Sequence, residues 1–199
     1  MDLIWPELLV LSQRKKNKCM MKFSFFLALC LVGFSSMGQL FMAQNGEVSF
    51  FSKTPLEDID AINKQVSSII NTANNEVAVQ MRVTQFTFPN KLMQEHFNEN
   101  YMESSLFPKA TFKGKISNFD AKKLSSTKTT FDLEGDLTIH GVTKKIKTKI
   151  NVTPSSGKIM ATASFDITPQ DYGIAIPNLV KDKIAKNIET TINFTLEPQ

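Results

Sequence analysis

Apolar and polar residues alternate along much of the second half of the chain. The pattern is cleanest from Thr127 to Ile139, where one parity is apolar and the other is charged: Phe131, Leu133, Leu137 and Ile139 against Lys128, Asp132, Glu134 and Asp136. The same alternation returns over residues 159–167 and 188–196. Because successive side chains of a strand point to opposite faces, each stretch predicts a strand with one buried face and one solvated face.

Turn-forming residues separate the predicted strands. Asn45-Gly46, His140-Gly141 and Pro154 to Gly157 each predict a hairpin, and the polar stretch Asn71 to Asn75 predicts a loop. Such short connections make consecutive strands antiparallel neighbours.

The alternation changes parity once. The odd positions of residues 77–83 are apolar, whereas the next two phenylalanines, Phe86 and Phe88, occupy even positions. This change predicts a β-bulge near Thr84 or Gln85.

Two short helices are expected to interrupt the strands. Thr54-Pro55-Leu56-Glu57 combines a capping threonine, a proline at the first helical position and a glutamate that can reach back to the cap. After Asn90, apolar residues recur at helical spacing as far as Tyr101. The second helix can therefore cover one end of the sheet with its apolar side.

A half-buried sheet of about eight strands must cover its apolar face, either by closing on itself or by stacking on a second sheet. The long strand that ends at Ile139 favours closure. The predicted fold class is therefore all-β with two short helices, an antiparallel β-barrel of about eight strands. Gly114 and Gly135 lie on the apolar face, where a missing side chain leaves a cavity or permits a bend in a coiled strand.

Residues 1–38 have the composition of an export leader. A basic stretch from Arg14 to Lys18, together with Lys22, precedes the 12-residue apolar run Phe23 to Phe34, and small residues follow up to Gly38. A membrane-spanning helix needs about 20 apolar residues, so a cleaved signal peptide is favoured over an uncleaved anchor. We expect cleavage near Gly38 and a periplasmic or secreted domain of residues 39–199.

The leader also accounts for the charge and the cysteines. It holds five of the 23 basic and two of the 19 acidic residues, which leaves 18 against 17. The mature domain is therefore not expected to bind nucleic acid. Both cysteines, Cys19 and Cys30, lie in the leader, so the domain has no thiol. Because residues 1–19 are too apolar for the basic end of a signal peptide, translation is expected to begin at Met20 or Met21.

Five stretches occur in an order that is typical of one known family: TPLEDI at Thr54–Ile59, LMQEHFNENYMES at Leu92–Ser104, FPKATFKGK at Phe107–Lys115, LTIHGVTK at Leu137–Lys144 and DYGI at Asp171–Ile174. With them the chain resembles the YceI-like, polyisoprenoid-binding proteins. The resemblance implies a secreted or periplasmic lipocalin-like barrel whose apolar pore holds an isoprenoid or another long-chain lipid, and a homodimer. The short strand pair expected around residues 39–52 departs from the family's fuller opening segment.

Phenylalanines are the candidate ligand-binding residues. Twelve of the 16 lie beyond the leader, and those on the inward parity either fill the core or line an apolar channel. Binding in such a channel comes from apolar area removed from water and needs few polar groups. The expected lining residues are Phe86, Phe88, Phe97, Phe112, Phe131, Leu133, Phe165 and Phe194.

The mature domain offers little for catalysis. It has two histidines and none of the spacings GxSxG, HExxH or a phosphate loop, so no catalytic residue, metal site or cofactor is expected. His140, beside Gly141, is interpreted as a turn residue with a side-chain hydrogen bond rather than a metal ligand. His96, on the apolar side of the second helix, is interpreted as a packed, hydrogen-bonded histidine rather than a ligand contact.

The sequence therefore predicts an exported lipid-binding protein that holds an isoprenoid or another long-chain apolar ligand for transport or storage. Two alternatives stay open. One is a filled barrel that serves as a structural or interaction protein, and the other is an enzyme that uses His140 on a lipid or quinone-like substrate.

Overall fold

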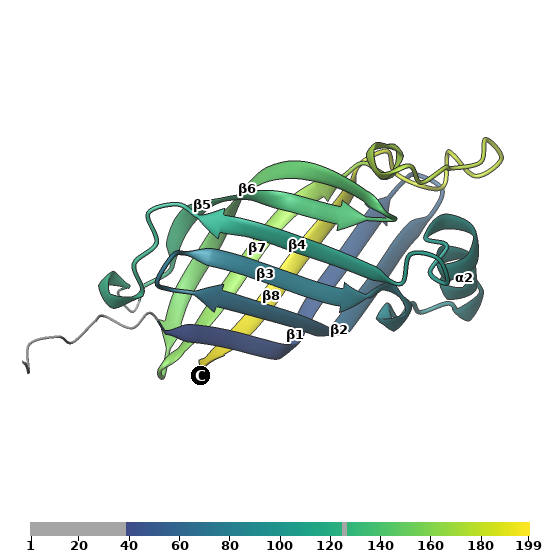
Figure 1. Cartoon of the computed structure of the whole chain (residues 1–199). Coiled ribbons are helices and arrows are strands. Elements are labelled where there is room, and N and C mark those ends of the chain that lie inside the picture. The colour runs from purple at the N-terminus through teal and green to yellow at the C-terminus, as the bar shows by residue number, and fades with distance from the viewer. Residues whose placement is uncertain (1–38, 125–126) are drawn as a thin grey trace, which may run out of the picture. The chain divides into compact units, whose positions relative to one another are not determined.

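A computed structural model describes residues 39–124 and 127–199, so the leader and its expected cleavage site lie outside the described residues. Eight antiparallel strands form one closed barrel in which each strand pairs with the next along the chain and β8 pairs with β1 (Figure 1). This confirms the predicted fold class. The strands are β1 (Leu40–Lys53), β2 (Asp58–Asn71), β3 (Glu76–Arg82), β4 (Lys109–Ile116), β5 (Thr129–Ile139), β6 (Val142–Ser155), β7 (Lys158–Ile167) and β8 (Ile188–Pro198).

One α-helix lies across an end of the barrel (Figure 1). It is α2 (Lys91–His96), which continues into the π-helical turn η3 (Phe97–Tyr101). The helix begins after Asn90, as predicted, and Asn90 caps it, because its Oδ1 accepts a hydrogen bond from the backbone N of Leu92 at 2.9 Å. Short 3₁₀ turns complete the described elements: η2 (Val83–Gln85), η4 (Ala121–Lys123) and η5 (Pro169–Tyr172). No helix among the described residues is long and apolar enough to cross a membrane.

The helix predicted at Thr54 does not form. The capping bonds are present, since Thr54 Oγ1 accepts from the backbone N of Leu56 at 3.3 Å and of Glu57 at 3.0 Å. However, β1 and β2 are already paired at Lys53 and Asp58, so only a four-residue connection separates them. The capping motif therefore closes a hairpin turn instead of starting a helix.

The hairpin predicted at Asn45-Gly46 is also wrong. β1 is a single strand of 14 residues, and its register against β2 shifts on both sides of Gly46, which marks a β-bulge. Gly46 is required there because the ring of Phe194 takes the place of a side chain; a Cβ would lie 2.7 Å from Phe194 Cε1. The barrel thus has a full opening strand rather than a short strand pair.

The parity change after β3 has a different cause from the expected bulge. The ladder between β3 and β4 ends at Arg82, and the chain then makes the 3₁₀ turn η2 before Phe86 and Phe88. Both phenylalanines are buried. The turn η2, and not a bulge within a strand, therefore changes the inward positions from odd residue numbers to even ones.

Gly114 and Gly135 face each other across β4 and β5. A Cβ on either residue would overlap the backbone of the facing strand and would approach Cζ of Phe112 to 2.5 Å from Gly114 or 2.7 Å from Gly135. The missing side chains therefore leave no open space. They admit the Phe112 ring and a close approach of the two strands.

The bulge of β1 can be tested with a double-mutant cycle. Gly46→Ala should destabilise the protein by about 1–3 kcal/mol because the new methyl group overlaps the Phe194 ring. Phe194→Leu removes that obstruction, so the double variant should lose less stability than the two single losses combined. Urea unfolding measures all three variants. Gly157→Ala is the control. Its methyl group meets nothing within 4 Å, so its loss of stability reports only the strain of an alanine at φ +80°. Strictly additive losses of stability at Gly46 and Phe194 would contradict the proposed contact.

Candidate functional site

Three apolar cavities follow one another along the barrel interior. The inner cavity, of about 80 Å³, is lined by side chains from all eight strands. The middle cavity, of about 100 Å³, shares lining residues with it, among them Val48, Met81 and Ala110. The outer cavity, of about 390 Å³, lies beside α2 and shares Phe50 and Phe97 with the middle one. The three cavities therefore form one apolar path that begins at the α2 end.

The end of the barrel opposite α2 is closed by side chains. These residues come from the strand ends that lie farthest from α2, and all are buried: Phe41, Ile116, Val152, Ile159 and Leu196. Phe119, from the connection between β4 and β5, packs edge to face on Phe131 with ring centroids 5.4 Å apart. The inner cavity is consequently a blind end.

Four phenylalanines meet where the middle and outer cavities join. Phe50 of β1, Phe86, Phe88 and Phe97 of η3 form a cluster in which neighbouring ring centroids lie 5.0 to 5.7 Å apart. Tilted and edge-to-face pairs of this kind stabilise the packing beyond the area that they bury. A ligand that passes from the outer to the middle cavity must pass these rings.

A segment without regular secondary structure, residues 174–187, borders the outer cavity. Its Ala185 backbone N donates to Oγ of the buried Ser52 at 2.8 Å. Lys183 Nζ lies 3.5 Å from Glu57 Oε2 in the β1–β2 turn. At its end, Asn187 Oδ1 accepts from Thr168 Oγ1 at 3.1 Å, and Ile174 at its start is buried in the core. Two hydrogen bonds, one partly exposed ion pair and the burial of Ile174 thus hold this segment against the barrel rim.

The polarity of the three cavities differs. The outer cavity has ionisable residues in its described lining, namely Glu57, His96, Tyr101 and Lys183, and burial raises the pKa of the Tyr101 phenol. The described linings of the inner and middle cavities hold none. An ionised group would therefore be stabilised only at the outer end.

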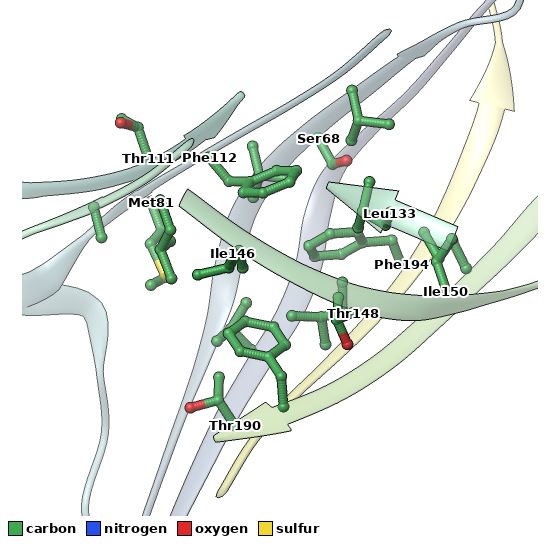
Figure 2. A pocket seen from close by; sticks show the side chains of 18 of the residues that line it. Ser68, Met81, Thr111, Phe112, Leu133, Ile146, Thr148, Ile150, Thr190 and Phe194 are labelled. Atoms are coloured by element: carbon green, nitrogen blue, oxygen red, sulfur yellow. The ribbon is translucent and has the colours of Figure 1, made fainter. Parts of the chain in front are cut away.

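The predicted lining residues lie at different depths of the path. Phe112, Leu133 and Phe194 line the inner cavity (Figure 2), and so does Phe165. Phe86 lines the middle cavity, Phe88 the outer one and Phe97 both. Phe131 lines none of the three, because it lies at the closed end against Phe119.

Sequence reasoning missed three groups of lining residues. Phe50 follows the bulge of β1, so the assumption of a hairpin hid its inward position. Ile174 and Val180 belong to an irregular segment that has no periodicity to read. Ser68 and Thr190 are hydroxyl residues on inward positions, and a search for apolar residues passes over them.

His140 has the role predicted for it. It precedes Gly141 in the β5–β6 turn, where both residues have positive φ. Its Nε2 donates to Glu103 Oε2 at 2.8 Å, and its Nδ1 lies 3.3 Å from the Tyr172 carbonyl oxygen. His140 therefore fastens the turn to two other segments. Within residues 39–124 and 127–199, no group of three His, Cys, Asp or Glu residues is placed to hold a metal ion.

The interpretation of His96 as a packed residue is wrong. α2 turns Met93 and Phe97 toward the core, and this rotation leaves Leu92 and His96 exposed. His96 lies instead in the lining of the outer cavity. The helical spacing identified the helix, but the side that faces the core is centred on Met93 and Phe97 and does not include Leu92 and His96.

Comparison with known proteins agrees with this architecture. The family model for the YceI-like domain matches residues 33–197. No curated protein sequence matches the chain significantly. Among solved structures, the barrel is similar to a polyisoprenoid-binding domain from Saccharophagus degradans implicated in plant cell wall breakdown, with a TM-score of 0.70 and 18% identity over 80% of this chain and 98% of that one.

Two further structures show the same fold at low identity. BcnA of Burkholderia cenocepacia has a TM-score of 0.64 and 14% identity, and the match covers 75% of this chain and 95% of BcnA. The YceI protein of Campylobacter jejuni has a TM-score of 0.55 and 17% identity, over 70% of this chain and 84% of that one. The eight-stranded barrel is thus shared across sequences that differ at most positions.

The depth of the phenylalanines leads to a prediction. Phe131→Ala should destabilise the protein by about 3 kcal/mol, because it leaves a hole beside Phe119 at the closed end. It should leave the binding of a slim fluorescent probe such as cis-parinaric acid unchanged, since Phe131 borders no cavity of the path. Phe165→Ala is the matched variant, as it enlarges the inner cavity and should change probe affinity. Equal effects of both substitutions on affinity would contradict this division.

Proposed function

Because the chain belongs to the YceI-like domain family, we propose that its barrel binds one long-chain apolar molecule, an isoprenoid or a comparable lipid, for transport or storage. The family is one of binding proteins, and the similar domain from Saccharophagus degradans is a polyisoprenoid-binding domain. The proposed ligand lies along the three cavities, with Phe112, Phe165 and Phe194 around its inner end.

One observation carries the proposal. Six side chains that face the inner cavity are only half-buried, so they keep surface that no protein atom covers: Val79, Met81, Ile146, Phe165, Ile167 and Ile192. In a filled barrel such inward side chains would be packed as closely as an organic crystal. This exposed apolar lining favours a binding protein over the filled-core alternative.

The width of the path limits the shape of the ligand. The inner cavity, of about 80 Å³, is the smallest of the three cavities of the path. A single slim chain fits this space once flexible side chains such as Met81 move aside. Fused rings and branched headgroups belong in the wider outer cavity.

The proposal assigns no catalysis to the barrel. His140, the sequence candidate for chemistry, lines none of the three cavities and is held by Glu103 and the Tyr172 carbonyl. A side chain fixed outside the ligand path has no substrate to act on.

Export and dimerisation are part of the proposal. The basic, apolar and small-residue order of residues 1–38 supports export to the periplasm or beyond, with a mature protein that begins near residue 39. The intact mass of the protein purified from its host tests where the mature protein begins. The homodimer that the family resemblance implies stays a prediction for solution measurements.

The bound lipid itself provides the direct test. The protein should be purified without detergent, extracted with organic solvent and analysed by mass spectrometry. We expect about one long-chain lipid for each chain, because the apolar path is otherwise exposed to water. A ligand-free protein whose high-resolution crystal structure shows a completely packed interior would refute the proposal.

A substitution that blocks the path gives a second test. Ala110 is 3% exposed and lines both the inner and middle cavities. Ala110→Leu should weaken the binding of the slim fluorescent probe cis-parinaric acid about tenfold, because the larger side chain fills the passage that its chain enters. Ala78→Leu on the exposed side of β3 is the control and should bind like the wild type. Fluorescence titration measures both; equal affinity of the two variants would argue against a path through the barrel.

A further inference from the structure

We propose that the ligand carries an uncharged oxygen group at its buried end and that the Ser68 hydroxyl binds this group. The inference rests on the proposed function, since it concerns the same barrel interior. It adds a specific residue and a chemical class to a site that otherwise selects only for apolar surface.

Ser68 is a buried polar residue with an unsatisfied hydroxyl. Its side chain is 1% exposed and lines the inner cavity together with Phe112, Leu133 and Phe194 (Figure 2). Its Oγ is buried and has no hydrogen-bond partner; among the fully buried side-chain nitrogen and oxygen atoms of the described residues, only Asn98 Oδ1 shares this property. A hydroxyl that is removed from water without a partner destabilises the ligand-free protein, and a partner on the ligand would reverse this cost.

Three threonines, Thr111, Thr148 and Thr190, also line the inner cavity, and Thr148 makes a useful contrast. Its Oγ1 donates to the Ser164 carbonyl oxygen at 3.3 Å, whereas Ser68 Oγ is buried without a partner. Ser68 lies three residues before the end of β2 at Asn71, on the far side of the barrel from α2. The free hydroxyl is therefore at the blind end of the path, where the leading end of a ligand would arrive.

The surroundings of Ser68 define the class of group that it can bind. A serine hydroxyl both donates and accepts, so it pairs with an alcohol, a carbonyl or an ether oxygen. The described lining of the inner cavity holds no ionisable residue, so a carboxylate or phosphate would be buried without a counter-charge. The small volume of about 80 Å³ further favours a small group on a slim chain. The ligand class is thus a long chain that ends in a hydroxyl or carbonyl group and enters with that end first.

The test compares two probe ligands of equal size, 1-dodecanol and n-tridecane, in competition with the slim fluorescent probe cis-parinaric acid on delipidated protein. Ser68→Ala should weaken 1-dodecanol about threefold to tenfold, the value of one hydrogen bond, and should leave n-tridecane unchanged. Thr148→Val is the matched control, since it removes a hydroxyl from the same cavity that already has a protein partner. It should not change the ratio of the two affinities.

Several outcomes separate this inference from the proposed function. If Ser68→Ala changes both affinities equally, or changes neither, then the Ser68 hydroxyl does not bind the oxygen group of the ligand, although the barrel still binds apolar chains. If neither compound displaces the probe from the wild-type protein, the inference and the proposed function fail together. Thermal unfolding gives a check without ligand: delipidated Ser68→Ala should melt at the wild-type temperature or higher, and a clear decrease would show that the hydroxyl has a partner inside the protein.

Discussion

Closure of the sheet between β1 and β8 is the constraint on which the rest of the molecule depends. Pairing of these strands leaves no edge, and it forces every inward side chain into a space that eight strands make just wide enough to fill. The room left for a ligand is therefore decided by single side chains. Phe194 lies over Gly46 and Phe112 over the glycine pair, whereas Met81 and Ile146 leave surface uncovered.

The sequence predicts the fold well for strands that have one buried face and one solvated face. β5, β7 and β8 could be predicted because a strand with one wet face has a period of two. β1 could not, because Asn45-Gly46 has the local chemistry of a turn. Only the ring of Phe194, which comes from the last strand, makes that glycine part of a bulge. Likewise, Thr54 forms the bonds of a helix cap, but the pairing of β1 with β2 turns the next residues into a hairpin connection.

The sequence predicts which type of residue lines the candidate site, but it does not predict where each residue lies along the barrel. Parity shows that Phe131 and Phe165 face inward, yet it carries no information about depth along the barrel, and only Phe165 reaches a cavity. The hydroxyl of Ser68 and the irregular segment 174–187 have no pattern that distinguishes them in the chain. Both acquire a role through their neighbours, which the fold brings together from distant parts of the sequence.

The attachment of residues 174–187 separates the rate of ligand release from the stability of the barrel, two properties that are linked in many binding proteins. This segment is held by the Ala185–Ser52 and Thr168–Asn187 hydrogen bonds, the Lys183–Glu57 ion pair and the burial of Ile174, and none of these contacts belongs to the strand ladder. Movement of the segment away from the outer cavity therefore breaks no bond that closes the barrel. Substitutions at the partly exposed Lys183–Glu57 pair are expected to change how long the proposed ligand stays bound with little effect on the stability of the barrel, so one scaffold can serve either as a rapid carrier or as a slow reservoir.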